Sequence, residues 1–86
     1  SIQLRAAEEL VQVAENRLRT LQRQRERLEA EMELRSGGSD WGADDIAAAE
    51  QRLRRAERRI LTTHAKLDSA RADVEALLAT DNHSAE

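Results

Sequence analysis

The fold is decided at residues 35–45, which read RSGGSDWGADD and hold all three glycines and the single tryptophan of the chain. The chain has no proline at all. Because glycine and proline are the strongest helix breakers, the segments on either side can each form one long helix. We therefore predict helices over residues 3–35 and 45–79, a loop over residues 36–44 and a disordered tail over residues 80–86.

Both flanking segments carry an unbroken heptad pattern. In the first, the a positions are Leu4, Val11, Leu18, Arg25 and Met32, and the d positions are Ala7, Ala14, Leu21, Leu28 and Arg35. In the second, the a positions are Ile46, Leu53, Ile60, Leu67 and Val74, and the d positions are Ala49, Ala56, Thr63, Ala70 and Leu77. This strict alternation of three and four residues is typical of a coiled-coil seam. The predicted fold class is all-α, an antiparallel two-helix coiled-coil hairpin.

One antiparallel register places every a position opposite a d position. Leu21 then lies opposite Ile60, and most layers pair a large residue with a small one, which lets the side chains interdigitate. At the helix ends, Gly37 or Gly38 is expected in the left-handed conformation that closes a helix. Asp44 is expected to cap the second helix, with Asp45 in its first turn.

Composition excludes several classes of function. The chain has 86 residues, of which 36% are charged and 1% aromatic, as in one small domain of long helices. It has no cysteine, and its two histidines have no nucleophile or second ligand nearby, so no catalytic residue, cofactor or metal is expected. No apolar run approaches the ~20 residues of a membrane span, so no membrane association is expected. The chain begins at Ser1 and is expected to be a piece of a larger protein; its compartment is unmarked, with the cytoplasm favoured.

The tip of the hairpin is the first candidate surface. Its candidate partner contacts are Asp40, Trp41, Asp44 and Asp45. The carboxylates either cap the helix and solubilise the loop or hold a cation, although their spacing matches no calcium loop. Trp41 either folds back over the last layer of the seam or offers an aromatic anchor to a partner.

A basic neck next to the tip is the second candidate surface. In the predicted register residues 17–35 lie beside residues 46–64, and this band holds eleven arginines and six glutamates in a chain whose net charge is −3. The candidate contacts in the neck are Arg19, Arg23, Arg27, Arg54, Arg55 and Arg58. The neck is either a solvated helix face or a nucleic-acid surface. No aromatic residue interleaves these arginines to stack on bases, which disfavours single-strand binding.

A glycine before an aspartate at the turn, followed by acidic residues that lead into an alanine-rich helix, suggests a family resemblance. The residues concerned are Gly38, Asp40, Asp44, Asp45 and the alanines at 47–49. From about Leu4 to Val74 the chain resembles the N-terminal hairpin of Gre-type transcript-cleavage factors and, more loosely, that of DksA-type regulators. The resemblance implies insertion of the tip into the secondary channel of RNA polymerase, where Asp40 with Asp44 or Asp45 would reach the active-site magnesium. The tip spacing differs from that family, and neither an Asn-Ala-Glu-Tyr-like run, an FKBP-like domain nor zinc-binding cysteines are found in these 86 residues.

The function predicted from the residues themselves is a non-enzymatic protein-interaction or oligomerisation module. A rigid rod would present its helix faces or its tip to a protein partner. Leu10, Val13, Leu34, Leu61 and Leu78 lie off the seam and could support a second hairpin, giving a four-helix homodimer. The alternatives are a polymerase-channel regulator that acts through the tip carboxylates and an RNA-binding hairpin that acts through the neck.

Overall fold

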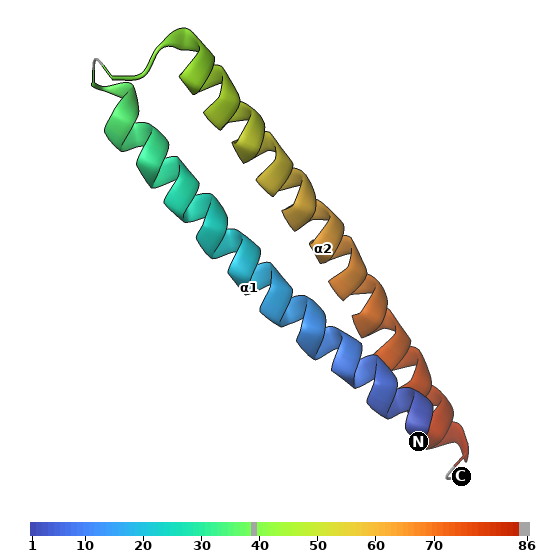
Figure 1. Ribbon diagram of the computed structural model, residues 1–86. Helices are drawn as coiled ribbons and strands as arrows, with labels where there is room; N and C mark the ends of the chain where they lie inside the picture. The colour runs from blue at the N-terminus through green and yellow to red at the C-terminus, as the bar shows by residue number, and fades with distance from the viewer. Residues whose placement is uncertain (39, 85–86) are drawn as a thin grey trace.

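The chain folds into two helices that lie side by side and run in opposite directions. The computed structural model describes residues 1–38 and 40–84, with α1 over Ile2–Ser36 and α2 over Ala43–Ser84. Figure 1 shows both chain ends at one end of the rod and the connecting loop at the other. The described residues contain no strand. The predicted all-α two-helix hairpin is therefore confirmed.

A helix of about 32 residues is ~48 Å long, and the rod is longer than this. It measures 69 × 15 × 14 Å. Because α2 alone has 42 residues, a rise of ~1.5 Å per residue gives a helix of about 63 Å. No described helix is long and apolar enough to cross a membrane.

Helix α1 starts and ends close to the predicted residues. Ser1 is its N-cap, because the Ser1 Oγ accepts a hydrogen bond of 3.1 Å from the Leu4 N–H. At the other end the expected left-handed glycine is absent. Gly37 is right-handed at φ −83° and ψ −5°, and none of the three glycines has a positive φ. The Gly38 N–H instead donates to the Arg35 carbonyl at 3.0 Å, closing a tight turn that needs no left-handed residue.

The assignment of Asp44 as the N-cap of the second helix is wrong. Helix α2 begins at Ala43, and the Gly42 carbonyl accepts the first helical hydrogen bond from the Ile46 N–H at 3.1 Å. Gly42 is therefore the capping residue, and the Asp45 Oδ2 reaches back to its N–H at 3.1 Å. This is the acidic half of a capping box, displaced by two residues from the predicted position.

Helix α2 also continues past its predicted end at Ala79 to Ser84. The apolar periodicity ends there, but no glycine or proline follows to terminate the helix. The Thr80 hydroxyl donates to the Ala76 carbonyl at 2.9 Å within this last part of the helix. The described helix thus includes residues 80–84 of the predicted tail, and residues 85–86 lie outside the described residues.

Burial follows the predicted seam. Of its twenty positions only Arg35 is exposed, and the others are buried or half-buried. The centre is a cluster of Leu18, Leu21, Ile60 and Leu67, in which Leu21 has only 2% of its surface exposed. Close approach of the helices is allowed by small residues, since the alanines at 7, 49 and 70 are also buried. The one buried polar residue among those described, Thr63, donates its hydroxyl to the Arg59 carbonyl at 2.8 Å.

The two arginines that interrupt the seam keep their charges in contact with water. Arg25 is half-buried and pairs with Glu29 at 3.4 Å, whereas the exposed Arg35 pairs with Glu31 at 3.6 Å. Both pairs are four residues apart on α1, and such exposed pairs contribute only ~0.3–0.5 kcal/mol. Across the helices Arg71 pairs with Glu15 at 3.5 Å. These pairs tune the surface, and burial along the seam holds the hairpin together.

Candidate functional site

The tip places its acidic residues on the surface without gathering them into a site. Asp40, Asp44 and Asp45 are exposed, and Asp45 is engaged by the Gly42 N–H. Among the described residues no group of three or more His, Cys, Asp or Glu side chains is arranged to hold a metal ion. The geometry therefore assigns Asp45 a capping role, and it does not assemble the tip carboxylates as a cation site.

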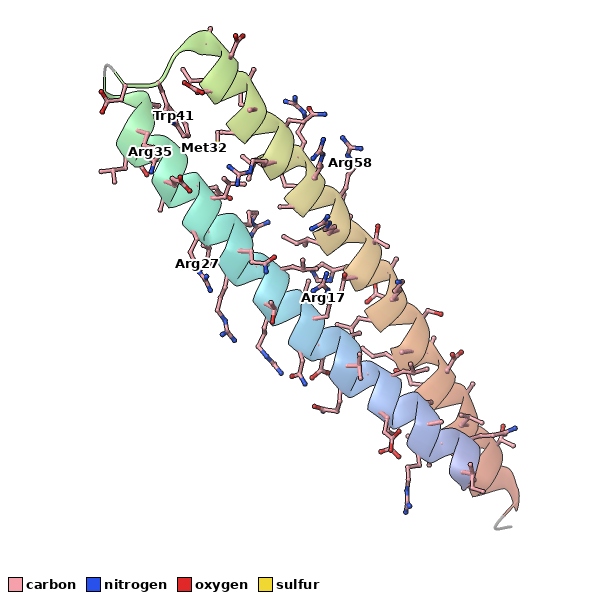
Figure 2. All side chains as sticks on the ribbon, in the orientation of Figure 1. Arg17, Arg27, Met32, Arg35, Trp41 and Arg58 are labelled. Atoms are coloured by element: carbon pink, nitrogen blue, oxygen red, sulfur yellow. The ribbon has the colours of Figure 1, made fainter. Side chains whose placement is uncertain are left out.

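Trp41 folds back against the end of α1. Its ring centroid lies 5.7 Å from the Arg35 guanidinium carbon, within the range of a cation–π contact. The side chain is half-buried. Figure 2 shows Trp41, Arg35 and Met32 gathered at the loop end of the hairpin. This contact ties the loop to the last layer of the seam.

A continuous groove runs along one side of the rod. We call it the side groove; it is lined by g and c positions of both helices beside d positions of the seam, together with Arg58. It extends from Gln3 to Glu31 on α1 and from Arg52 to Leu77 on α2. Its middle section has a volume of about 700 Å³, and the sections toward the tip and toward the chain ends have about 440 Å³ and 460 Å³. Adjacent sections share lining residues, Leu10 and Asp73 on one side and Leu21 and Arg59 on the other.

Exposed apolar side chains lie in the middle section of the side groove and in its section toward the chain ends. Leu10 is 59% exposed and Val13 is 65% exposed, and both line the middle section of the groove together with Ala14 and Ala70. Single exposed aliphatic residues are ordinary on protein surfaces. In this groove two of them continue a strip of alanines, Ala6, Ala7 and Ala76, toward the chain ends. The result is an apolar strip next to the seam.

Six cations lie at g and c positions on the same side as this strip. They are Arg17, Arg27, Arg52, Arg55, Arg59 and Lys66. Figure 2 places Arg17 between the two helices. None of the six forms a salt bridge or a side-chain hydrogen bond with any described residue. Carboxylates at g and c positions number only three, namely Glu31, Asp45 and Asp73.

The predicted basic neck is not one surface. Arg27 and Arg55 line the side groove toward the tip, and Arg58 lines its middle section. Arg19 and Arg54 occupy b positions on the opposite side of the seam, where they hydrogen-bond to Asn16 and Gln51 of their own helices. Arg23 is at an exposed outer f position. Only Arg27, Arg55 and Arg58 of the six predicted contacts are therefore brought together.

The side of the hairpin opposite the groove is acidic. Five of the six glutamates in the neck band occupy b or e positions, namely Glu26, Glu29, Glu33, Glu50 and Glu57. Only Glu31 of that band lies on the groove side. The positive charge that the sequence placed in a band around the rod is thus concentrated along one of its two long sides.

The six neck contacts predicted from the sequence left out the cations Arg17, Arg52, Arg59 and Lys66. Leu10 and Val13 were predicted only as support for a second hairpin, and not as part of one surface with these cations. The signal was present in the heptad, because g and c positions share one side of a seam and e and b positions share the other. Sorting the charges by heptad position, and not only along the chain, would have found the groove side.

Comparisons of the chain with protein-family models, with curated proteins and with solved structures gave no match. The resemblance to Gre-type factors therefore rests only on the sequence pattern of the hairpin and its tip. The candidate site has to be interpreted from its own chemistry.

Proposed function

We propose that the hairpin is a non-enzymatic coiled-coil module that binds another protein through its helix faces. The observation that carries the proposal is the side groove, in which Leu10 and Val13 expose more than half of their surface beside a floor of Ala14 and Ala70. Full burial of a Leu or Val side chain stabilises by about 1.5–3 kcal/mol, and these two are less than half buried in the hairpin alone. A partner that covers them gains most of that free energy.

The long, narrow shape of the hairpin supports the same function. A rod of 69 × 15 × 14 Å has little interior in which to build a substrate cavity, and its grooves are open along the side. Its surface is well suited to the lateral packing of further helices, which is how helical bundles grow. Association of two hairpins is the oligomerisation form of this proposal.

Site-specific photocrosslinking tests the proposal. A photoreactive amino acid is placed at Val13 in the side groove or, as a matched control, at Leu61, which is similarly exposed at 68% but occupies a b position on the opposite side. We expect irradiation in an extract of the native source to give discrete protein adducts from position 13 and few from position 61. Adducts that are mainly nucleic acid, or equal protein labelling from the two positions, would contradict the proposal.

A further inference from the structure

We propose that the side groove binds one amphipathic α-helix of another protein, with an acidic half toward the tip and an apolar half toward the chain ends. This inference rests on the proposed protein-interaction function and deepens it by naming the chemistry of the partner. Three features of the groove carry it: its dimensions, its division into an apolar and a basic half, and its unpaired cations.

The dimensions fit a helix. Along α1 the groove extends from Gln3 to Glu31, which corresponds to ~42 Å at ~1.5 Å per residue and so to a partner helix of about 28 residues. The lining of the half toward the chain ends includes three short side chains, Ala6, Ala7 and Ala76. Short side chains let a third helix approach the two helices of the hairpin closely.

The chemistry changes along the groove. Toward the chain ends the lining is mainly apolar, with Leu10 and Leu77 beside the alanines. Toward the tip it contains Arg27, Arg52, Arg55 and Arg59 and one carboxylate, Glu31. Glu31 is itself paired with Arg35 at 3.6 Å. A helix with leucines in one half and glutamates in the other matches both halves in only one direction.

The unpaired cations select an acidic partner. The four arginines toward the tip make no salt bridge with described residues. Carboxylates spaced three and four residues apart on a partner helix lie on one face and can pair with such a row of guanidinium groups. Complementary charge of this kind determines orientation and specificity more than affinity.

A second copy of the hairpin matches the groove less well. If two hairpins packed with their grooves together, the six cations at g and c positions of one copy would face only three carboxylates of the other. These are Glu31, Asp45 and Asp73. A nucleic acid also matches only half of it, because the apolar strip has nothing to donate to phosphates and no aromatic side chain lines the groove to stack on a base.

Fluorescence anisotropy of a synthetic peptide tests the inference with the purified hairpin. The probe is a capped, dye-labelled helical peptide of about 28 residues, with leucine at the groove-facing positions of one half and glutamate at those of the other. A second peptide carries lysine in place of each glutamate, and a single-stranded RNA carries the same net charge as the first peptide. We expect saturable binding of the acidic peptide, and binding at least roughly tenfold weaker for the lysine peptide.

Two adjacent arginines supply matched variants. Arg55 lines the groove, whereas Arg54 is exposed on the opposite side. We expect Arg55→Glu to weaken binding of the acidic peptide roughly tenfold and Arg54→Glu to change it by less than about twofold. Circular dichroism of both variants should show the helix content of the parent protein, since neither position is buried. Equal effects of the two changes would overturn the assignment of the groove.

Energy transfer from Trp41, the only tryptophan, reports the direction of the bound helix. A dansyl group on the acidic end of the peptide should receive more energy from Trp41 than one on the apolar end. The reverse order would overturn the proposed orientation.

Three other outcomes would overturn the inference, whereas the proposed function is tested separately by the photocrosslinking experiment. Stronger binding of the RNA than of the acidic peptide would make the groove a nucleic-acid surface. Dimerisation of the hairpin that Val13→Glu abolishes, without peptide binding, would make a second copy the occupant. Protein adducts from position 13 without acidic-peptide binding would leave the interaction module intact and refute only the acidic, amphipathic class of partner.

Discussion

Truncation of Leu21 to alanine is the sharpest test of how the hairpin is held together. Leu21 is 2% exposed and lies in the central cluster with Leu18, Ile60 and Leu67. The change removes three carbon atoms, which corresponds to about 2.4 kcal/mol at ~0.8 kcal/mol for each methylene. A cavity term normally adds to this cost.

The cavity term should be small at this position. Leu21 lines the side groove in both its middle section and its section toward the tip. The space left by the truncation therefore opens toward solvent, and its walls can relax. We therefore expect a loss of about 2–3 kcal/mol, near the lower end of the range for buried leucines. For a domain of this size that loss lowers Tm by roughly 10–20 °C.

Leu34→Ala is the matched control, because it makes the same chemical change at a site that is 82% exposed. Its effect should stay within about 0.5 kcal/mol. Both variants are compared with the parent protein by urea and thermal unfolding, followed by circular dichroism. Measurements at two protein concentrations are needed because self-association would add to the apparent stability. A Leu34→Ala loss as large as that of Leu21→Ala would refute the assignment of the seam.

Two further predictions concern the register and the tip. In this cysteine-free chain, cysteines at Val11 and Ala70 should form a disulfide within one molecule on mild oxidation, as read from mobility on a non-reducing gel. Cysteines at Val11 and Leu53 should not form one. Crosslinking of that second pair alone would show that the register is wrong. Arg35→Ala should remove the contact at 5.7 Å from the Trp41 ring, shift the tryptophan emission to longer wavelength as the ring meets water, and cost only ~0.5–1 kcal/mol. An unchanged emission spectrum would show that the contact does not hold the ring in solution.

Local sequence preferences did not predict the exact ends of the helices. Asp44 and Asp45 are both good candidates for capping, and local preference cannot separate them from Gly42, which takes the position. The choice depends on how the loop crosses from α1 to α2, and that crossing is set by the packing of the two helices. Likewise, the loss of apolar periodicity after Ala79 ends the seam without ending the helix, since a helix needs a breaking residue or competing contacts to terminate.

The candidate site divides in the same way. The sequence alone identified the abundance of arginine near the tip and the exposed leucines, because composition and heptad position are visible in one dimension. Heptad position also separates Arg55, at a c position, from Arg54, at a b position, since neighbours along a helix differ in direction by about 100°. Only the structure shows that the g and c positions line an open groove.

By itself the sequence determined the two helices, their antiparallel seam and the position of the turn. Those features follow from a period of 3.5 residues in apolar side chains and from the confinement of every glycine to one short stretch. Only the tertiary structure decided that Trp41 lies on Arg35 and that Arg58 and the six cations at g and c positions line one groove with Leu10 and Val13. The first is a contact across the turn and the second joins residues distant in sequence, and both exist only once burial of the seam has fixed how the two helices face each other.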